Sequence, residues 1–508
     1  MMMKFLIQSV FTELILVCVS LPHSAVAEPF KVARTAIPPS RGIPFTAVSQ
    51  PGVGIWSLMY DTLTRIDNQG NVEPALAESW ESISPTQWVF RLRQGVRFHN
   101  GEMFDASSVT ASIALLKSET GARFYTASEV QGITAVEVID SLTVLIETEK
   151  PDPILHRRAS LLWMLPPGAL ADRGVDSFAQ EPIGSGPFQL EEWGAGTVHF
   201  RGFSGSWRAP VAIDDLTIFV MQDPVARMQA LRSGQVDVAE QMSSDDVSQL
   251  KGEQFQTYTR TAPGVSGLAF RVIGNESSPV ADRRVRQAMN LAVNREAIVN
   301  NLYQGEVLAS GQGAVPGVNG HNPEVKPWPF DPTRARALLE EADFDFDRIL
   351  KIQVATGIAG GDSLAFQFVA QNLEAIGMKV ELRSIPYANW LTAFLTNQWD
   401  DIDAFSLTWD NSAYYDGIRA ETYTGCLKAQ PFFCAPETKR LLNAISVEMD
   451  PTRRTALLQD LMAMLHDIAP AIWLVTGAEF AAAGQNVDGI ALTSRGIQYD
   501  LVSLKNGQ

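Results

Sequence analysis

Three of the Asp-Pro pairs in this chain, each followed by an amphipathic stretch, constrain its fold more than any other feature. Aspartate accepts hydrogen bonds from the free N–H groups of a first helical turn, and proline fits the first helical position because no acceptor is needed there. The pairs predict helices that begin at residues 223, 331 and 450. The first carries Val225, Met228 and Leu231 on one face and ends at Gly234, before a strand-like run. The pattern predicts a mixed α/β fold.

Length adds a second constraint. Domains run roughly 50 to 250 residues, so a chain of 508 residues predicts two or three lobes. Residues 281–305 have the pattern of two helices in tandem, the second capped by Asn294 and ended by Gly305.

The N-terminus has the pattern of an export signal. Lys4 precedes an apolar stretch at residues 5–19, and an Ala-x-Ala-like site predicts cleavage of residues 1–27. A membrane anchor is the alternative, but the stretch is short and no second apolar span follows it in the sequence. Lipidation at Cys18 is a minor alternative because Val17, rather than a small residue, precedes it.

Cysteine usage agrees with export. Without the signal only Cys426 and Cys434 are left, and in an oxidising compartment two cysteines this close in a loop are expected to form a disulfide. The alternative is a pair of free buried thiols. The six histidines are scattered, with none at helical i, i+4 spacing, so neither a metal site nor a cofactor is predicted.

Charge and motifs narrow the function. The net charge of -17 and the absence of basic runs argue against a nucleic-acid partner. The sequence has no G-x-S-x-G, H-E-x-x-H, P-loop or G-x-G-x-x-G motif. Enzymes that assemble a triad or a carboxylate pair from distant positions stay possible.

Five segments, in order, resemble the extracytoplasmic solute-binding proteins of peptide-type ABC importers, the family of dipeptide- and oligopeptide-binding proteins. Within them, Trp80, Trp88 and Phe90 have the alternation of a strand core, and His99 is expected on the surface or in a turn beside Gly101. The segments are LTRIDNQGNVEPALAESWESISPTQWVFRLRQGVRFHNGEMFDASSVTAS (63–112), PIGSGPFQLEEW (182–193), DPVARMQALRSGQVDVAE (223–240), ADRRVRQAMNLAVNREAIV (281–299) and FDPTRARALLEEADF (330–344).

The resemblance implies a type II-like periplasmic-binding-protein fold, with two lobes joined by a hinge and an additional domain. The chain would cross between the lobes near Arg271 and near Gly484. The implied division is signal peptide 1–27, lobe I from 28–60, 185–270 and 485–508, additional domain 61–184, and lobe II 271–484.

The nine-residue stretch WDNSAYYDG, residues 409–417, is the candidate ligand segment. In the peptide-binding relatives this stretch carries an aspartate that pairs with a ligand ammonium, and the resemblance places Asp410 there. Aromatic faces with polar tips suit a ligand wall, although such side chains also pack in cores. The predicted ligand-binding residues are Trp409, Asp410, Asn411, Tyr414 and Tyr415.

Two departures limit the implied ligand. The relatives continue with an Asp-Pro-Asp-like run that this stretch lacks. Dipeptide binders also carry an arginine for the ligand carboxylate at a helix start that corresponds here to 360–364, where no arginine occurs and Asp362 would repel an anion. A longer peptide, an opine, an oligosaccharide or a chelated metal is therefore an alternative ligand.

The resemblance implies a monomeric periplasmic protein that delivers a small ligand, expected to be a peptide or peptide-like compound, to an ABC permease without catalysis. The alternative from another class is a secreted hydrolase that uses Asp410 and Asp416 as acid and base.

Overall fold

The computed structural model describes residues 29–48, 50–208, 210–356 and 362–505. The predicted export signal at 1–27 lies outside these ranges. Helices and strands alternate through the described chain, which confirms the α/β prediction.

Ten strands form one large sheet, in the order β14-β13-β15-β12-β16-β11-β1-β10-β9-β8. Its two longest strands, β12 and β16, are antiparallel neighbours in the middle of that order. The strands are β1 (Phe30–Arg34), β8 (Phe188–Trp193), β9 (Thr197–Gly202), β10 (Asp215–Val220), β11 (Val238–Glu240), β12 (Phe255–Phe270), β13 (Ile349–Thr356), β14 (Lys379–Pro386), β15 (Ala404–Asp410) and β16 (Ala471–Gly484).

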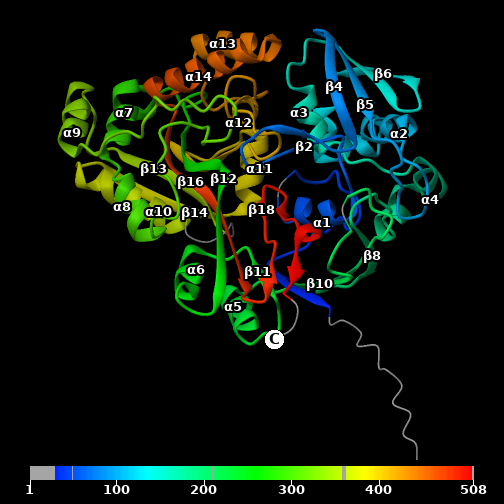
Figure 1. Ribbon diagram of the computed structural model, residues 1–508. Coiled ribbons are helices and arrows are strands. Elements are labelled where there is room, and N and C mark those ends of the chain that lie inside the picture. Colours follow the sequence, from blue (N-terminus) through cyan, green and yellow to red (C-terminus); the bar gives the residue numbers. More distant parts are fainter. Residues whose placement is uncertain (1–28, 49, 209, 357–361, 506–508) are drawn as a thin grey trace, which may run out of the picture.

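The two long strands join two lobes. At one end β16 pairs with β11 of the first lobe, and at the other end β12 pairs with β15 of the second lobe. The β12–β16 register shifts between Ala262 and Val265, where Pro263 and Gly264 interrupt the ladder. Figure 1 shows the first lobe, with α5 and α6, at the bottom of the view and the second lobe at the upper left.

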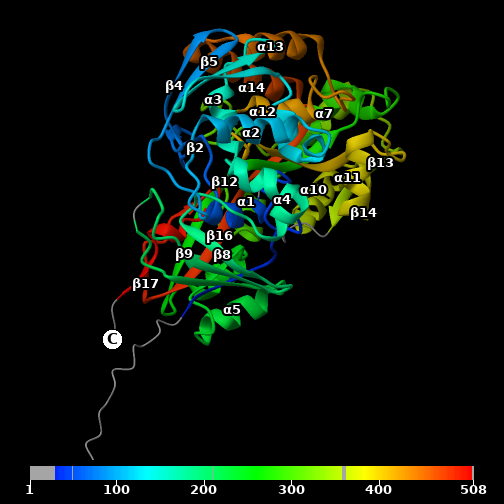
Figure 2. The same ribbon diagram turned by 90° about the vertical axis from the view of Figure 1, so that its right-hand side faces the viewer.

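A four-stranded antiparallel sheet, in the order β4-β5-β7-β6, lies apart from the large sheet. Its strands are β4 (Ala77–Ser84), β5 (Gln87–Leu92), β6 (Ile133–Asp140) and β7 (Thr143–Thr148). Figures 1 and 2 place it beside α13 and α14, above the first lobe. Trp88 and Phe90 of β5 are buried and Trp80 packs against the same core, as the alternation predicts. This core continues through Trp56 to Phe188 of the first lobe, so the two units share one hydrophobic cluster.

The predicted helix starts are confirmed. Each aspartate of the three Asp-Pro pairs accepts a hydrogen bond from the backbone N–H three residues on, and Asn294 caps α8 in the same way. Met228 and Leu231 are buried, whereas Val225, in the first turn of α5, is 56% exposed. Within the described ranges no helix combines the length and apolarity that a membrane crossing needs. The helices are α1 (Gly52–Met59), α2 (Ala106–Lys117), α3 (Leu155–Arg158), α4 (Pro167–Gln180), α5 (Pro224–Arg232), α6 (Ser244–Leu250), α7 (Arg283–Ala292), α8 (Arg295–Leu302), α9 (Pro332–Glu341), α10 (Asp362–Ala375), α11 (Tyr387–Thr396), α12 (Ile418–Thr424), α13 (Pro436–Val447) and α14 (Pro451–Ile468).

His99 lies in a turn, as predicted, but its ring is not a free surface group. Its Nδ1 accepts a hydrogen bond from the Gly184 N–H, its Nε2 lies 3.0 Å from the Gly186 carbonyl oxygen, and its edge meets Phe203. Burial lowers the pKa of His99 to about 4, so the ring is neutral. This histidine ties the turn after β5 to the start of β8.

Candidate functional site

The candidate ligand segment begins where β15 leaves the sheet. Trp409 and Asp410 pair with Val265 and Gly264 of β12, next to the register shift between the two long strands. The segment then turns through residues 411–417 into α12. The end of β15 therefore places this stretch beside the chain crossing between the lobes.

Asp410 is the exposed carboxylate of the segment. Its Oδ1 accepts a hydrogen bond from the Ser412 N–H at 2.9 Å, which fixes the turn, and no Lys, Arg or His of the described chain lies within 4 Å of the carboxylate. Glu479 of β16 is near enough for the Asp410 charge to add to the rise in the pKa of Glu479, which comes chiefly from burial. Asp410 is thus able to accept a positive group.

Asp416, six residues later, is in the opposite environment. It is fully buried, and both of its oxygens accept hydrogen bonds from the Arg454 guanidinium, at 2.6 and 2.9 Å. Asn319 donates to the same carboxylate at 2.8 Å. Burial alone would raise the pKa of Asp416, but the charge and hydrogen bonds of Arg454 outweigh it and lower the pKa. A buried, ion-paired carboxylate is unable to meet a substrate, so Asp410 and Asp416 do not form an acid–base pair.

The other predicted ligand residues are all buried. Trp409 meets Trp473 edge to face at 5.7 Å, and Asn411 donates to the Gly313 carbonyl oxygen and accepts from the Ala420 N–H. These contacts use the side chains of Trp409 and Asn411 inside the second lobe. Their direct contact with ligand stays a prediction.

Arginines from other segments hold the two tyrosines. Arg157 of α3 donates to the carbonyl oxygens of Gly70, Tyr414 and Tyr415, and Arg158 lies over the Tyr414 ring. Arg260 of β12 donates to the Tyr415 hydroxyl at 2.9 Å and pairs with Glu479 at 2.8 Å. The unit that carries the four-stranded sheet therefore contacts the ligand segment directly. Local sequence gives no signal for this, because the partners are about 155 to 258 residues apart.

A pocket lies where four distant segments meet, and we call it the junction pocket. It is lined by Val48 and Val53 near the N-terminus, Ser160 and Trp163 after α3, Ser412 of the ligand segment, and Arg495. Val53 belongs to α1 and Ser412 directly follows the β15–β12 pairing. Both lobes and the additional unit, which carries the four-stranded sheet, therefore contribute residues to the lining of the junction pocket. The hydroxyl of Ser412 is buried and has no hydrogen-bond partner among the described residues.

The helix start where dipeptide binders place an arginine lies partly outside the described residues, which resume at α10 (Asp362–Ala375). In the part of the chain that the structure describes, no three His, Cys, Asp or Glu side chains gather to hold a metal ion.

Two lobes, strands that cross between them and a pocket at their junction are the architecture expected of a solute-binding protein. Residues 71–426 match the family described as bacterial extracellular solute-binding proteins, family 5 Middle, and the chain belongs to this family. It is 26% identical over 454 residues to a di/tripeptide-binding protein 2 of Pseudomonas aeruginosa, covering 83% of this chain and 84% of the relative. It is 25% identical to a glutathione-binding protein of Salmonella paratyphi A, covering 91% and 92%. The fold matches the solved structure of HbpA2 from Haemophilus parasuis with a TM-score of 0.82, at 21% identity, over 94% of this chain and 99% of that chain.

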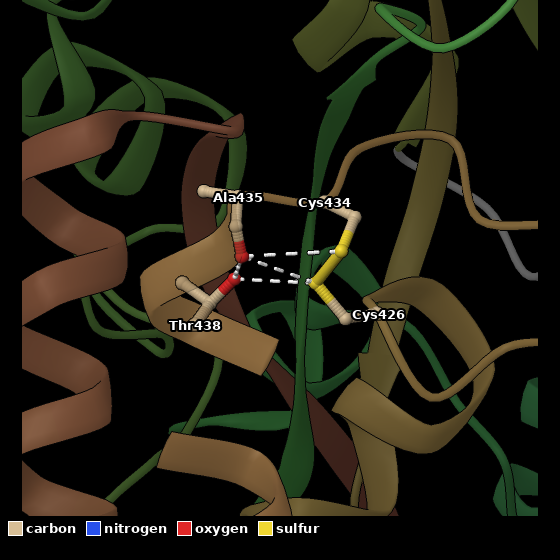
Figure 3. Close-up of a disulfide and its surroundings, with 4 residues drawn as sticks. All are labelled: Cys426, Cys434, Ala435 and Thr438. Carbon is tan, nitrogen blue, oxygen red and sulfur yellow. Dashed lines mark hydrogen bonds between the residues drawn. A yellow bond between two sulfur atoms is a disulfide. The ribbon is translucent and has the colours of Figure 1, made fainter. Parts of the chain in front are cut away.

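The predicted disulfide between Cys426 and Cys434 is confirmed. Figure 3 shows the two sulfurs joined beside Ala435 and Thr438, at the start of α13, and the Cα atoms are 4.8 Å apart. Trp409 and Cys426 line a common pocket, so the crosslinked loop packs behind the ligand segment.

Replacing both cysteines by alanine is expected to lower the free energy of unfolding by roughly 2 to 3 kcal/mol, since the bridge closes a short loop in the unfolded chain. Urea unfolding of the double variant and of the oxidised protein measures the difference. Two titratable thiols in the denatured, unreduced protein would contradict the disulfide.

Proposed function

We propose that this protein is the periplasmic solute-binding component of an ABC importer, which captures a small peptide or peptide-like ligand by closure of its lobes and delivers it to the membrane permease. The junction pocket carries this proposal, because it is lined by segments of both lobes and of the additional unit. A ligand held there contacts both sides of the hinge. It therefore binds the closed form better, and that difference in affinity is what shifts the population.

We place the hinge at the irregular β12–β16 pairing near Ala262–Val265. Along these two antiparallel strands it lies between the predicted crossings, which are near Arg271 at one end of the pairing and near Gly484 at the other. Few backbone angles need change there while packed units move as rigid bodies. The cluster shared by the first lobe and the four-stranded sheet makes those two one body, so the second lobe is the moving part. The division of the chain into lobe I, the additional domain and lobe II, with boundaries at residues 60, 184, 270 and 484, is likewise a proposal.

The peptide assignment rests on the relatives and on one group in this chain. The Pseudomonas relative is named for di- and tripeptides and the Salmonella relative for glutathione, which is peptide-like. Asp410 supplies an exposed, unpaired carboxylate for an ammonium group. No catalytic step is assigned, and we propose a monomer without a nucleic-acid partner.

Closure is tested by small-angle scattering of the mature protein with and without a saturating mixture of di- to pentapeptides. Ligand is expected to reduce the radius of gyration and to increase hydrogen-exchange protection near 262–265 and 475–478. A peptide that saturates the protein without either change would count against hinge closure. To identify an unliganded state that is already closed, the radius of gyration of the unliganded protein is compared with that of a variant in which a bulky side chain replaces Ser412 and holds the junction pocket open.

Asp410→Ala is expected to weaken binding of an ammonium-bearing peptide by about 2 kcal/mol or more, because the ligand charge loses its partner in a closed site. Isothermal titration calorimetry with the tightest-binding peptide of the mixture measures the change. N-acetylation of the same peptide should cost wild-type protein a similar amount and cost Asp410→Ala little. Equal affinities of the two proteins would assign Asp410 a structural role only.

A further inference from the structure

Arg495 is a cationic side chain that the described chain partly buries without an ion-pair partner. It lies at the turn of the hairpin formed by β18 (Leu492–Thr493) and β19 (Gly496–Ile497). There its backbone N–H donates a hydrogen bond to Thr493 Oγ1. Gly496, with φ of +91°, lets the hairpin approach Gly54 and Gln50 closely. The hairpin thus presents Arg495 to the junction pocket from a fixed backbone.

The Arg495 side chain is positioned by neutral groups only. Its guanidinium lies 4.9 Å from the centre of the Trp163 ring, and Nη2 donates to Thr62 Oγ1 and to the Ser160 carbonyl oxygen. Within the described chain no carboxylate lies within 4 Å of it, and its side-chain hydrogen bonds to described residues come from Nη2. An arginine carries five N–H donors in a planar fork, so most of this fork is left for another acceptor.

The cations near Arg495 already have acidic partners of their own: Arg208 pairs with Asp61 and Asp500, and Arg65 pairs with Glu73. Arg208 and Arg65 are close enough to disfavour the charge of Arg495, and Asp61, which favours it, also accepts hydrogen bonds from Arg208, Trp207 and Ser185. Burial, with the charges of Arg208 and Arg65, lowers the pKa of Arg495 to about 10 against the opposing charge of Asp61, so Arg495 is still charged at neutral pH. A bound anion would offset the free-energy cost of keeping this guanidinium charged and partly buried.

We propose that Arg495 binds a carboxylate of the ligand in the junction pocket, with the unpartnered hydroxyl of Ser412 as a second donor. The inference rests on the solute-binding function proposed above and names the ligand class: a small organic acid, and for a peptide one with a free C-terminus. Asp410, two residues before Ser412, would take the ammonium end. Arg495 would bind the ligand carboxylate from the first lobe, whereas an arginine near 360–364 would bind it from the second lobe. A zwitterionic ligand would then contact Arg495 in the first lobe and Asp410 in the second.

The test compares matched ligands on wild-type protein, Arg495→Gln and Arg495→Lys, with Arg383→Gln on the edge strand β14 as the control. The probes are di- to pentapeptide mixtures with free or amidated C-termini, non-peptide acids (succinate, citrate and an N-carboxyethyl amino acid) and neutral oligosaccharides. Thermal stabilisation screens them, and calorimetry then gives the dissociation constants.

Free-acid ligands are expected to bind wild-type protein and Arg383→Gln at least tenfold more tightly than their amides, and Arg495→Gln should lose that difference. The amide comparison is made within wild-type protein, so it holds even if a variant unfolds. Equal binding of acids and amides, or unchanged binding by Arg495→Gln, overturns the proposal, as does binding of neutral oligosaccharides alone. Binding of non-peptide acids without any peptide would support Arg495 and refute the peptide assignment.

Discussion

Replacing Asp416 by asparagine is expected to destabilise the folded protein by about 3–5 kcal/mol, although the side chain changes by only one atom group. Arg454 is 3% exposed and has both of its terminal nitrogens on Asp416. Asparagine offers one acceptor and no negative charge, so the variant leaves a guanidinium buried without a counter-charge. Breaking one side of a buried pair costs far more than the pair contributes against an apolar replacement.

The matched control for this variant is Asp410→Asn, in the same segment. Asp410 is exposed and without an ion pair in the described chain, so its replacement should change the free energy of unfolding by no more than about 0.5 kcal/mol. Urea unfolding at pH 7 measures both. Equal effects of the two substitutions would show that the Asp416–Arg454 pair is not what holds this turn.

The pH dependence gives a second readout. A carboxyl group whose pKa is lowered in the folded state adds stability above its unfolded pKa, and that stability is lost as pH falls through the folded value. The difference between wild-type protein and Asp416→Asn should therefore be largest at neutral pH and shrink in acid. A difference that is constant from pH 7 to pH 3 would exclude the charge as its origin.

These two aspartates show where sequence reasoning stops. WDNSAYYDG holds both within seven positions, and nothing local separates an exposed carboxylate from one that is buried against α14. The decisive partner, Arg454, comes 38 residues later, and Asn319 comes 97 residues earlier. Helix starts were predictable because Asp-Pro and Asn caps act within one helical turn. Buried ion pairs such as Asp416–Arg454 were not predictable because they depend on tertiary packing.

The candidate site follows the same division. The disulfide was predictable since both cysteines lie in one loop, and the strand core at Trp88 and Phe90 was predictable from its period of two. Arg495 gave no signal, because an isolated arginine near the C-terminus is normally a solvated charge. Only the hairpin that brings it to Ser160 and Trp163 shows that it faces a pocket.

Glu421 lines a second pocket, together with Trp409. The carboxylate is 4% exposed, and Trp409, Phe432 and Phe433 share its pocket. No basic side chain of the described chain lies within 4 Å of it. Burial raises the pKa of Glu421 to about 7, so at neutral pH the second lobe carries a carboxyl group that is only partly ionised.

Glu421→Gln is expected to stabilise the protein by about 3 kcal/mol at pH 8, because a rise from 4.5 to about 7 corresponds to 1.36 kcal/mol for each pH unit. The sign follows from proton binding. Between pH 4.5 and 7 the folded state holds a proton that the unfolded state has lost, so wild-type stability falls as pH rises and levels off above 7. Glutamine keeps the shape and removes the titration, so the two proteins should be alike near pH 4.5 and diverge toward pH 8. Urea unfolding from pH 4.5 to 8.5 measures this, with Glu374→Gln on the exposed face of α10 as the control. A gain that is the same at every pH would show that it does not come from the titration of Glu421, and a loss of stability at pH 8 would show that the carboxylate has a stabilising partner in its pocket.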